Sequence, residues 1–133
     1  MTRILLADAN REVRTALRLV IEQRGSSQII GEAFDAVNLF TQAAMNCPDV
    51  VLLDADLTGL QIHHASQTSR LGEVIATLHV LCPAIRVIAL SSQPSAKKLC
   101  YSAKADAFIC KSDPPEMLLA LLDQIIQSKD TEC

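Results

Sequence analysis

Short runs of consecutive apolar residues recur along the chain and are separated by longer segments of mixed polarity. Such runs are typical of strands buried on both faces of a parallel sheet. The runs predict strands at 4–7, 50–54, 87–91 and 107–110, and the weaker run 28–32 predicts a further short strand.

Between these runs, apolar residues recur at the spacing of an amphipathic helix. The first predicted helix follows Asn10, a favourable N-cap, and its expected inner face is Val13, Ala16, Leu17, Val20 and Ile21. The second follows Asp35, and its expected inner face is Val37, Phe40, Ala43 and Ala44. The remaining helices are predicted at about 70–81, 94–104 and from about 113 onward.

The alternation of strand and helix predicts an α/β fold. Repeated strand–helix–strand units pair in parallel with right-handed crossovers, so helices cover both faces of the sheet. The 133 residues suit one domain, and no linker or internal repeat divides them. We therefore expect a single three-layer domain over residues 1–133.

Polar residues end four of the predicted strands. Asp8, Asp54, Ser91 and Lys111 each follow directly on an apolar run. In open α/β sheets, ligands bind outside the carboxyl ends of the strands. The sequence thus predicts a site with two acids, a hydroxyl and an amine at one edge of the sheet.

Composition excludes several classes of function. Half of the residues are apolar and the net charge is −3, with no basic stripe for direct nucleic-acid binding. No apolar run is long enough to span a membrane and no signal peptide is apparent, so a cytoplasmic location is expected. The five cysteines lack C-x-x-C spacing, which predicts reduced thiols. Zinc binding by His63, His64 and His79 is disfavoured, because no ligand follows at a suitable spacing.

As a set, the strand ends and turns resemble the receiver domain of bacterial two-component response regulators, above all receivers that precede a helix-turn-helix DNA-binding domain. The segments that carry the resemblance are 5–8, 30–33, 48–54 with Gly59, 87–91, 105–108 with Lys111, and 115–118. The resemblance implies a flavodoxin-like, doubly wound sheet of five parallel strands in the order 2-1-3-4-5.

The resemblance also implies a function. Asp54 matches the phosphoacceptor, and Lys111 matches the cation that pairs with the phosphoryl oxygens. Ser91 and Phe108 match the switch residues that pass the signal to the surface formed by the last two helices and the last strand. The implied partners are a histidine kinase or a phosphotransfer protein. The protein would be an autocatalytic phosphoacceptor switch and not an enzyme.

The expected metal site departs from the family pattern. The implied Mg²⁺ ligands are Asp8, Asp54 and the backbone carbonyl of Asp56. Receivers usually carry a second acid where this chain has Ala9, which cannot coordinate a metal. Loss of a carboxylate ligand lowers affinity, so weak Mg²⁺ binding is expected.

Other departures leave two functions open. Thr58 replaces a usual proline, and Lys104 and Ala107 replace glycines, which predicts a different backbone geometry before the last strand. Segment 60–69 is longer than usual and could cover the site or form a partner surface. The first function is a phosphorelay receiver controlling an output such as transcription, with a DNA-binding effector domain outside this chain. The alternative is a phosphorylation-independent pseudo-receiver that acts as an interaction or homodimerisation module.

Overall fold

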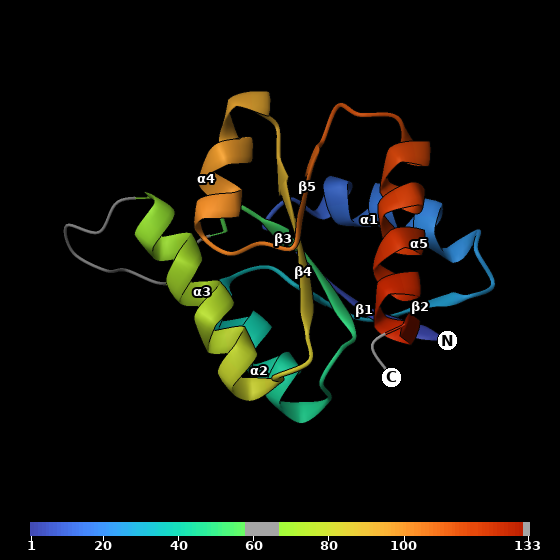
Figure 1. Ribbon diagram of the computed structural model, residues 1–133, viewed down its shortest axis with the longest axis horizontal. Helices are drawn as coiled ribbons and strands as arrows, with labels where there is room; N and C mark the ends of the chain where they lie inside the picture. Colours follow the sequence, from blue (N-terminus) through green and yellow to red (C-terminus); the bar gives the residue numbers. More distant parts are fainter. Residues whose placement is uncertain (58–66, 132–133) are drawn as a thin grey trace.

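A five-stranded parallel sheet forms the centre of the computed structural model, which describes residues 1–57 and 67–131 (Figure 1). The strands are β1 (Thr2–Ala7), β2 (Ser27–Ala33), β3 (Val50–Asp54), β4 (Arg86–Ser91) and β5 (Ala107–Cys110). Their order is β2-β1-β3-β4-β5, and every neighbouring pair is parallel. The predicted fold class and strand order are confirmed.

Helices cover both faces of the sheet. They are α1 (Arg11–Glu22), α2 (Ala36–Met45), α3 (Gln67–Leu81), the 3₁₀ turn η1 (Pro94–Ala96), α4 (Lys97–Ser102) and α5 (Pro115–Thr131). In Figure 1, α1 and α5 lie on one side of the sheet and α2, α3 and α4 on the other. None of the described helices has the length and apolar character of a membrane span.

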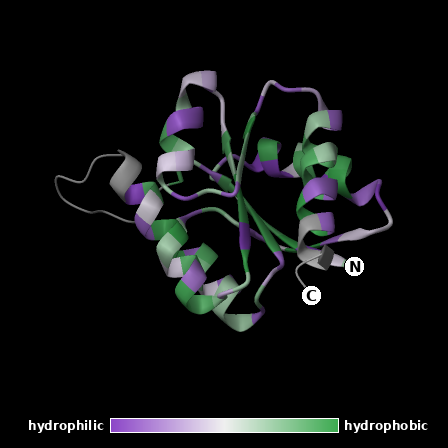
Figure 2. Ribbon diagram, in the orientation of Figure 1, coloured by the Kyte–Doolittle hydropathy of each residue, from purple (hydrophilic) through white to green (hydrophobic). Residues whose placement is uncertain are grey.

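The core divides into two layers because alternate residues of each strand point to opposite faces. Leu5, Val51 and Val87 pack with α2, α3 and α4, whereas their neighbours Leu6, Leu52 and Ile88 pack with α1 and α5. The strands are accordingly the most hydrophobic part of the molecule in Figure 2. Burial on both faces explains why they read as continuous apolar runs.

The predicted inner face of α2 is confirmed for Ala43 and in part for Phe40, which packs against the core, but it is wrong for Val37 and Ala44. Val37 is 60% exposed and Ala44 is exposed, whereas Ala36, Leu39 and Ala43 are buried. Asp35 caps the helix as expected, accepting a hydrogen bond from Asn38 N–H at 2.8 Å. Leu39, which is fully buried, lies between the two buried alanines on the face that packs against the sheet. In α1, Ala16 is exposed instead of buried.

Helix α3 begins at Gln67, earlier than the predicted start near residue 70. Its inner residues Leu71, Val74, Ile75 and Leu78 are buried as predicted. Thr58, Gly59 and the histidines His63 and His64 lie outside the described residues, as does the part of the long connection up to residue 66.

The turn before β5 retains a left-handed residue, although no glycine is present. Lys104 has a φ of 75°, and its N–H bonds to the carbonyl of Tyr101 at 3.0 Å. The difference from the usual family geometry stays a prediction, and Lys104 takes a conformation that glycine adopts without cost. The hydrogen bonding of the turn holds Lys104 in a conformation that costs a side chain energy.

The prediction that all cysteines are reduced thiols is also wrong. Cys47, after α2, and Cys82, after α3, form a disulfide. Among the described residues, Cys100 and Cys110 are free and buried. Tertiary packing unites two cysteines that are 35 positions apart, a distance over which spacing motifs give no signal.

Candidate functional site

The carboxyl ends of three strands deliver charged side chains to one edge of the sheet. Asp8 follows β1 and its N–H bonds to Ala33 O, while Asp54 is the last residue of β3. Lys111 follows β5, and its N–H bonds to Ser91 O at 2.8 Å. The parallel ladder thus fixes the backbone from which each of these side chains projects.

The side chains of Asp8, Asp54 and Lys111 meet. Lys111 Nζ lies 2.7 Å from Asp8 Oδ2 and 3.5 Å from Asp54 Oδ2. Asp8 is 1% exposed and Asp54 7% exposed. One ammonium therefore bridges two nearly buried carboxylates, so the structure brings together the two acids and the amine among the four groups that were predicted to meet at this edge.

Backbone groups hold the other oxygen of each carboxylate. Asp54 Oδ1 accepts a hydrogen bond from Asp56 N–H at 3.0 Å, and Asp8 Oδ1 accepts one from Asn10 N–H at 2.8 Å. These short turns orient both acids so that their Oδ2 atoms face the ammonium. Asp8 Oδ2 is buried and makes no hydrogen bond within the described residues, so the ion pair alone compensates its burial.

Burial and charge shift the protonation of this group. Burial raises the pKa of the Asp54 carboxyl, and the nearby Asp8 raises it further, against the opposing effects of Asp56 N–H and Lys111. Burial by itself lowers the pKa of Lys111, but Asp8 and Asp54 together raise it above its usual value. Lys111 is consequently a permanent cation at neutral pH.

Ser91 and Phe108 lie near this edge, but among the described residues neither side chain makes a polar contact with the side chains of Asp8, Asp54 or Lys111. Ser91 is 2% exposed, and its Oγ accepts a hydrogen bond from Gln93 N–H at 3.1 Å. Across the described chain, that hydroxyl makes no hydrogen bond to Asp54 or Lys111. Phe108 is half-buried and packs on the face covered by α2, α3 and α4. The switch roles of both residues stay predictions.

Two arginines near the site were not apparent in the sequence. The Arg14 guanidinium donates to the carbonyl of Asp8 and pairs with Glu32 at 3.0 Å, which ties the turn after β1 to α1 and β2. Arg70, at the start of α3, lines a small hollow beside Asp54. The separation of Arg14 from Asp8 and Glu32 along the chain carries no specific signal, and Arg70 could only be placed once the start of α3 was known.

Two carboxylate oxygens at this edge are potential ligands for a divalent cation. Asp8 Oδ2 is a buried carboxylate oxygen without a hydrogen bond within the described residues. Asp54 Oδ2 forms an ion pair with the same Lys111 ammonium as Asp8 Oδ2 does. Within the described residues, no group of three or more His, Cys, Asp or Glu residues could hold a metal. Two carboxylates and a carbonyl fit Mg²⁺ only if water completes its octahedron.

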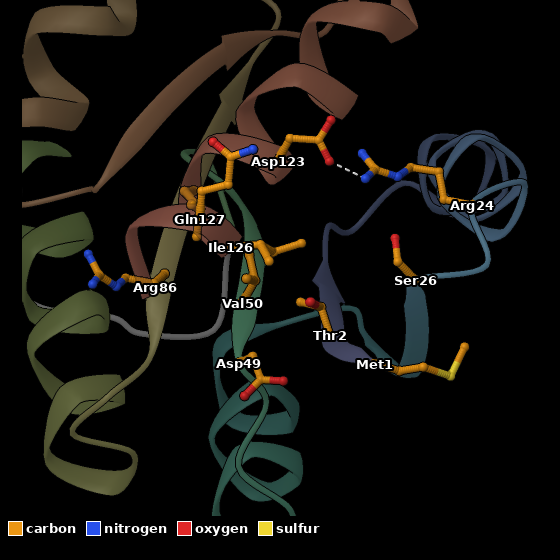
Figure 3. Close-up of a pocket in the computed structure, with 11 residues that line it drawn as sticks. Met1, Thr2, Arg24, Ser26, Asp49, Val50, Arg86, Asp123, Ile126 and Gln127 are labelled. Carbon is orange, nitrogen blue, oxygen red and sulfur yellow. Dashed lines mark hydrogen bonds and ion pairs between the residues drawn. The ribbon is translucent and has the colours of Figure 1, made fainter. Parts of the chain in front are cut away.

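A larger hollow, of about 580 Å³, lies at the opposite edge of the sheet (Figure 3). Its lining includes Arg24 and Arg86, which stand on opposite sides of it in Figure 3. Arg24 pairs with Asp123, and Arg86 lies 4.0 Å from Asp106. Because the charged side chains that line it are dispersed and Arg24 is paired with Asp123, this hollow does not resemble a reaction site.

Solved structures match nearly the whole chain. A two-component response regulator of the LuxR family from Aurantimonas sp. SI85-9A1 is 24% identical with a TM-score of 0.79, covering 96% of this chain and 87% of that one. A CheY-like receiver domain protein from Methanospirillum hungatei JF-1 is 19% identical with a TM-score of 0.77, covering 100% and 99%. A DNA-binding response regulator of the LuxR family from Staphylococcus aureus is 20% identical with a TM-score of 0.74, covering 94% and 98%.

The fold is that of response regulator receiver domains. No family model and no curated protein matches the sequence. At these identities the matches establish the receiver fold, while the chemical roles of Asp8, Asp54 and Lys111 stay predictions.

Proposed function

We propose that this protein is a phosphoryl-accepting receiver of two-component signalling, with Asp54 as the acceptor. The observation that carries the proposal is the contact of one ammonium, Lys111, with two nearly buried carboxylates at the carboxyl edge of the sheet. The receiver fold of the matched structures supports the same reading.

The chemistry begins with the ionised Asp54 carboxylate. One of its oxygens attacks phosphorus in a phosphohistidine or a small acyl phosphate, and the bond from phosphorus to the leaving nitrogen or oxygen breaks. The product is an aspartyl phosphate, which water later hydrolyses to restore the carboxylate. The transferred group carries about two negative charges in place of the single charge of the carboxylate, and the Lys111 ammonium neutralises them in part.

Asp8 and Asp54, with the carbonyl of Asp56, would hold Mg²⁺ in this site. When bound, the ion would neutralise charge on the transferred oxygens. The buried Asp8 keeps Lys111 at the site in either case, because the ammonium is its ion-pair partner. The absence of a second acid at Ala9 makes weak binding the expectation.

Phosphorylation would shift an equilibrium between two conformations of Ser91 and Phe108. The Ser91 hydroxyl would leave Gln93 N–H and turn toward a phosphoryl oxygen, and Phe108 would follow it inward. The surface formed by α4, β5 and α5 would then change its contacts with an output, which we take to be transcription. A histidine kinase or phosphotransfer protein would be the donor, in the cytoplasm.

The rival function is a pseudo-receiver, a constitutive interaction or dimerisation module without phosphoryl chemistry. Two observations favour it: Ala9 supplies no ligand, and Ser91 Oγ is engaged with the backbone of Gln93. It predicts that partner binding is the same with and without a carboxylate at position 54.

Incubation with acetyl phosphate and Mg²⁺, followed by intact mass, separates the two functions. We expect the mass of one added phosphoryl group, which is lost in the Asp54→Asn variant and kept in Asp56→Asn, a change of the exposed neighbouring acid. No added mass in natively folded protein would favour the pseudo-receiver.

A further inference from the structure

The ends of α2 and α3 carry the same dipeptide. Cys47-Pro48 follows α2 and Cys82-Pro83 follows α3. Proline disfavours the helical conformation in the residue before it, so each cysteine lies where its helix has stopped and the chain turns toward the next strand. The two thiols thereby occupy equivalent positions on neighbouring helices.

Packing brings these equivalent positions together. Helices α2 and α3 cover the same face of the sheet, and the Cα atoms of Cys47 and Cys82 lie 5.7 Å apart, inside the usual range of roughly 4.4–6.8 Å for a disulfide. Cys82 belongs to the buried core of this face, and Cys47 packs against it. The pairing is thus part of the tertiary structure.

The same backbone also suits the reduced thiols. Cys82 Sγ lies 3.4 Å from the carbonyl oxygen of Ala43, and Cys47 Sγ lies 3.5 Å from that of Leu81. Each carbonyl can accept a hydrogen bond from the S–H group that reduction creates. Opening the disulfide therefore leaves no buried donor without an acceptor.

We propose that Cys47 and Cys82 form a reversible dithiol–disulfide site that couples the α2–α3 half of the domain to the redox state of its surroundings. In a reducing compartment, disulfides are usually transient and regulatory. The disulfide itself is part of the structure. Its regulatory role rests on the proposed function, which places the protein in the cytoplasm.

The redox step is thiol–disulfide exchange with a low-molecular-weight disulfide. Cys47 is half-buried and Cys82 only 3% exposed, so Cys47 is the sulfur that an outside molecule reaches. The Cys47 thiolate attacks one sulfur of the external disulfide, whose S–S bond breaks and whose other sulfur leaves as a thiolate. The Cys82 thiolate then attacks Cys47 Sγ and releases the second external sulfur.

The exchange conserves atoms, electrons and protons. Two protein thiols are oxidised, one external disulfide is reduced to two thiols, and the two cysteine protons end on those thiols. In the reverse direction an external thiolate attacks Cys47 Sγ, and Cys82 leaves as the thiolate.

The bond closes a loop that contains the proposed acceptor. Residues 47–82 include β3, Asp54 and all of α3. At its amino-terminal end α3 lines the hollow beside Asp54, and at its other end it stops at Cys82. Oxidation would therefore link the carboxyl end of α3 covalently to the end of α2. Hydrogen exchange of the backbone amides in α3 would then slow.

The test is a titration of the folded full chain with defined mixtures of reduced and oxidised glutathione, after which acid stops the exchange, free thiols are alkylated in denaturant, and peptides are mapped by mass. We expect a reversible transition that protects only Cys47 and Cys82 from alkylation. Reduction should lower the Tm by roughly 10 °C, since a loop of this length constrains the unfolded chain. The Tm of Cys47→Ser and Cys82→Ser should not depend on the mixture, whereas Cys133→Ser should behave as the parent protein does.

Two results would overturn the proposal. One is natively folded protein in which both thiols stay alkylatable in every mixture. The other is a bond that glutathione opens only after global unfolding, which would make it a fixed structural link. If the serine variants fail to fold, titration of the parent protein decides alone. Asp54→Asn should titrate identically, so the result is independent of phosphoryl transfer.

Discussion

The Lys111 ammonium lies 2.7 Å from Asp8 Oδ2, closer than its 3.5 Å separation from Asp54 Oδ2. Its tighter partner is therefore the more deeply buried acid and not the proposed nucleophile. Asp8 anchors the cation, and Asp54 keeps an oxygen that a reacting group can approach. This division of roles leads to the first two predictions.

Replacing Asp54 by Asn should stabilise the protein at neutral pH. Burial raises the pKa of the Asp54 carboxyl in the folded state. A raised folded-state pKa contributes stability that is fully present below the unfolded pKa and is lost as pH rises through the folded pKa. At neutral pH the ionised acid thus costs free energy, and the neutral amide removes a cost on the order of 1 kcal/mol. Denaturant unfolding measures the difference.

The pH dependence provides the control for that measurement. The gain in unfolding free energy from Asp54→Asn should shrink as the pH falls through the raised folded-state pKa of Asp54, and it should be gone below about pH 4, where the acid is protonated in both the folded and the unfolded state. A gain that is constant between neutral and acidic pH would contradict the electrostatic explanation.

Lys111→Met should lower both stability and reactivity. The change keeps the aliphatic stem but leaves two nearly buried carboxylates without their cation, which should cost about 1–3 kcal/mol of unfolding free energy. Loss of a positioned charge should also slow phosphorylation by acetyl phosphate about 100-fold or more. Lys98→Met, at an exposed position of α4, is the matched control. Equal effects of the two variants would disprove the special role of Lys111.

Lys104→Gly should stabilise the protein. The φ of 75° at Lys104 is costly for a residue with a side chain and free for glycine, which predicts a gain of about 1 kcal/mol in thermal or denaturant unfolding. Lys104→Ala removes the same charge but keeps the strained backbone. If Lys104→Ala stabilises as much as Lys104→Gly, the gain comes from the charge and the conformational explanation is wrong.

Sequence reasoning found the strands and the edge that carries the site because both depend on local signals. Where Asp54 or Lys111 ends an apolar run, its charged group lies at the carboxyl edge of a parallel sheet. This position does not depend on how the helices pack. The inner face of α2 was predicted only in part, because both candidate faces of that helix are apolar and only packing against the sheet selects Leu39 over Val37.

The disulfide was missed for a different reason. Spacing arguments consider cysteines that are close in sequence, whereas Cys47 and Cys82 meet because two helices end side by side. The repeated Cys-Pro dipeptide was the one available signal, since it marks the end of both helices. Contacts such as that of Arg14 with the carbonyl of Asp8 depend on side-chain paths that no local pattern specifies.

Ala9→Asp should strengthen Mg²⁺ binding. Ala9 is exposed and directly follows Asp8, whose Oδ1 is fixed by Asn10 N–H, so a carboxylate at position 9 would add a third acid beside Asp8 and Asp54. A lost metal ligand or its support commonly costs about 10–100-fold in affinity, and its restoration should recover a gain of that size. Calorimetric titration with MgCl₂ measures the affinity, and Ala9→Asn, which adds a neutral side chain of similar size, is the matched control. An unchanged affinity in Ala9→Asp would show that Asp8 and Asp54 do not form the metal site.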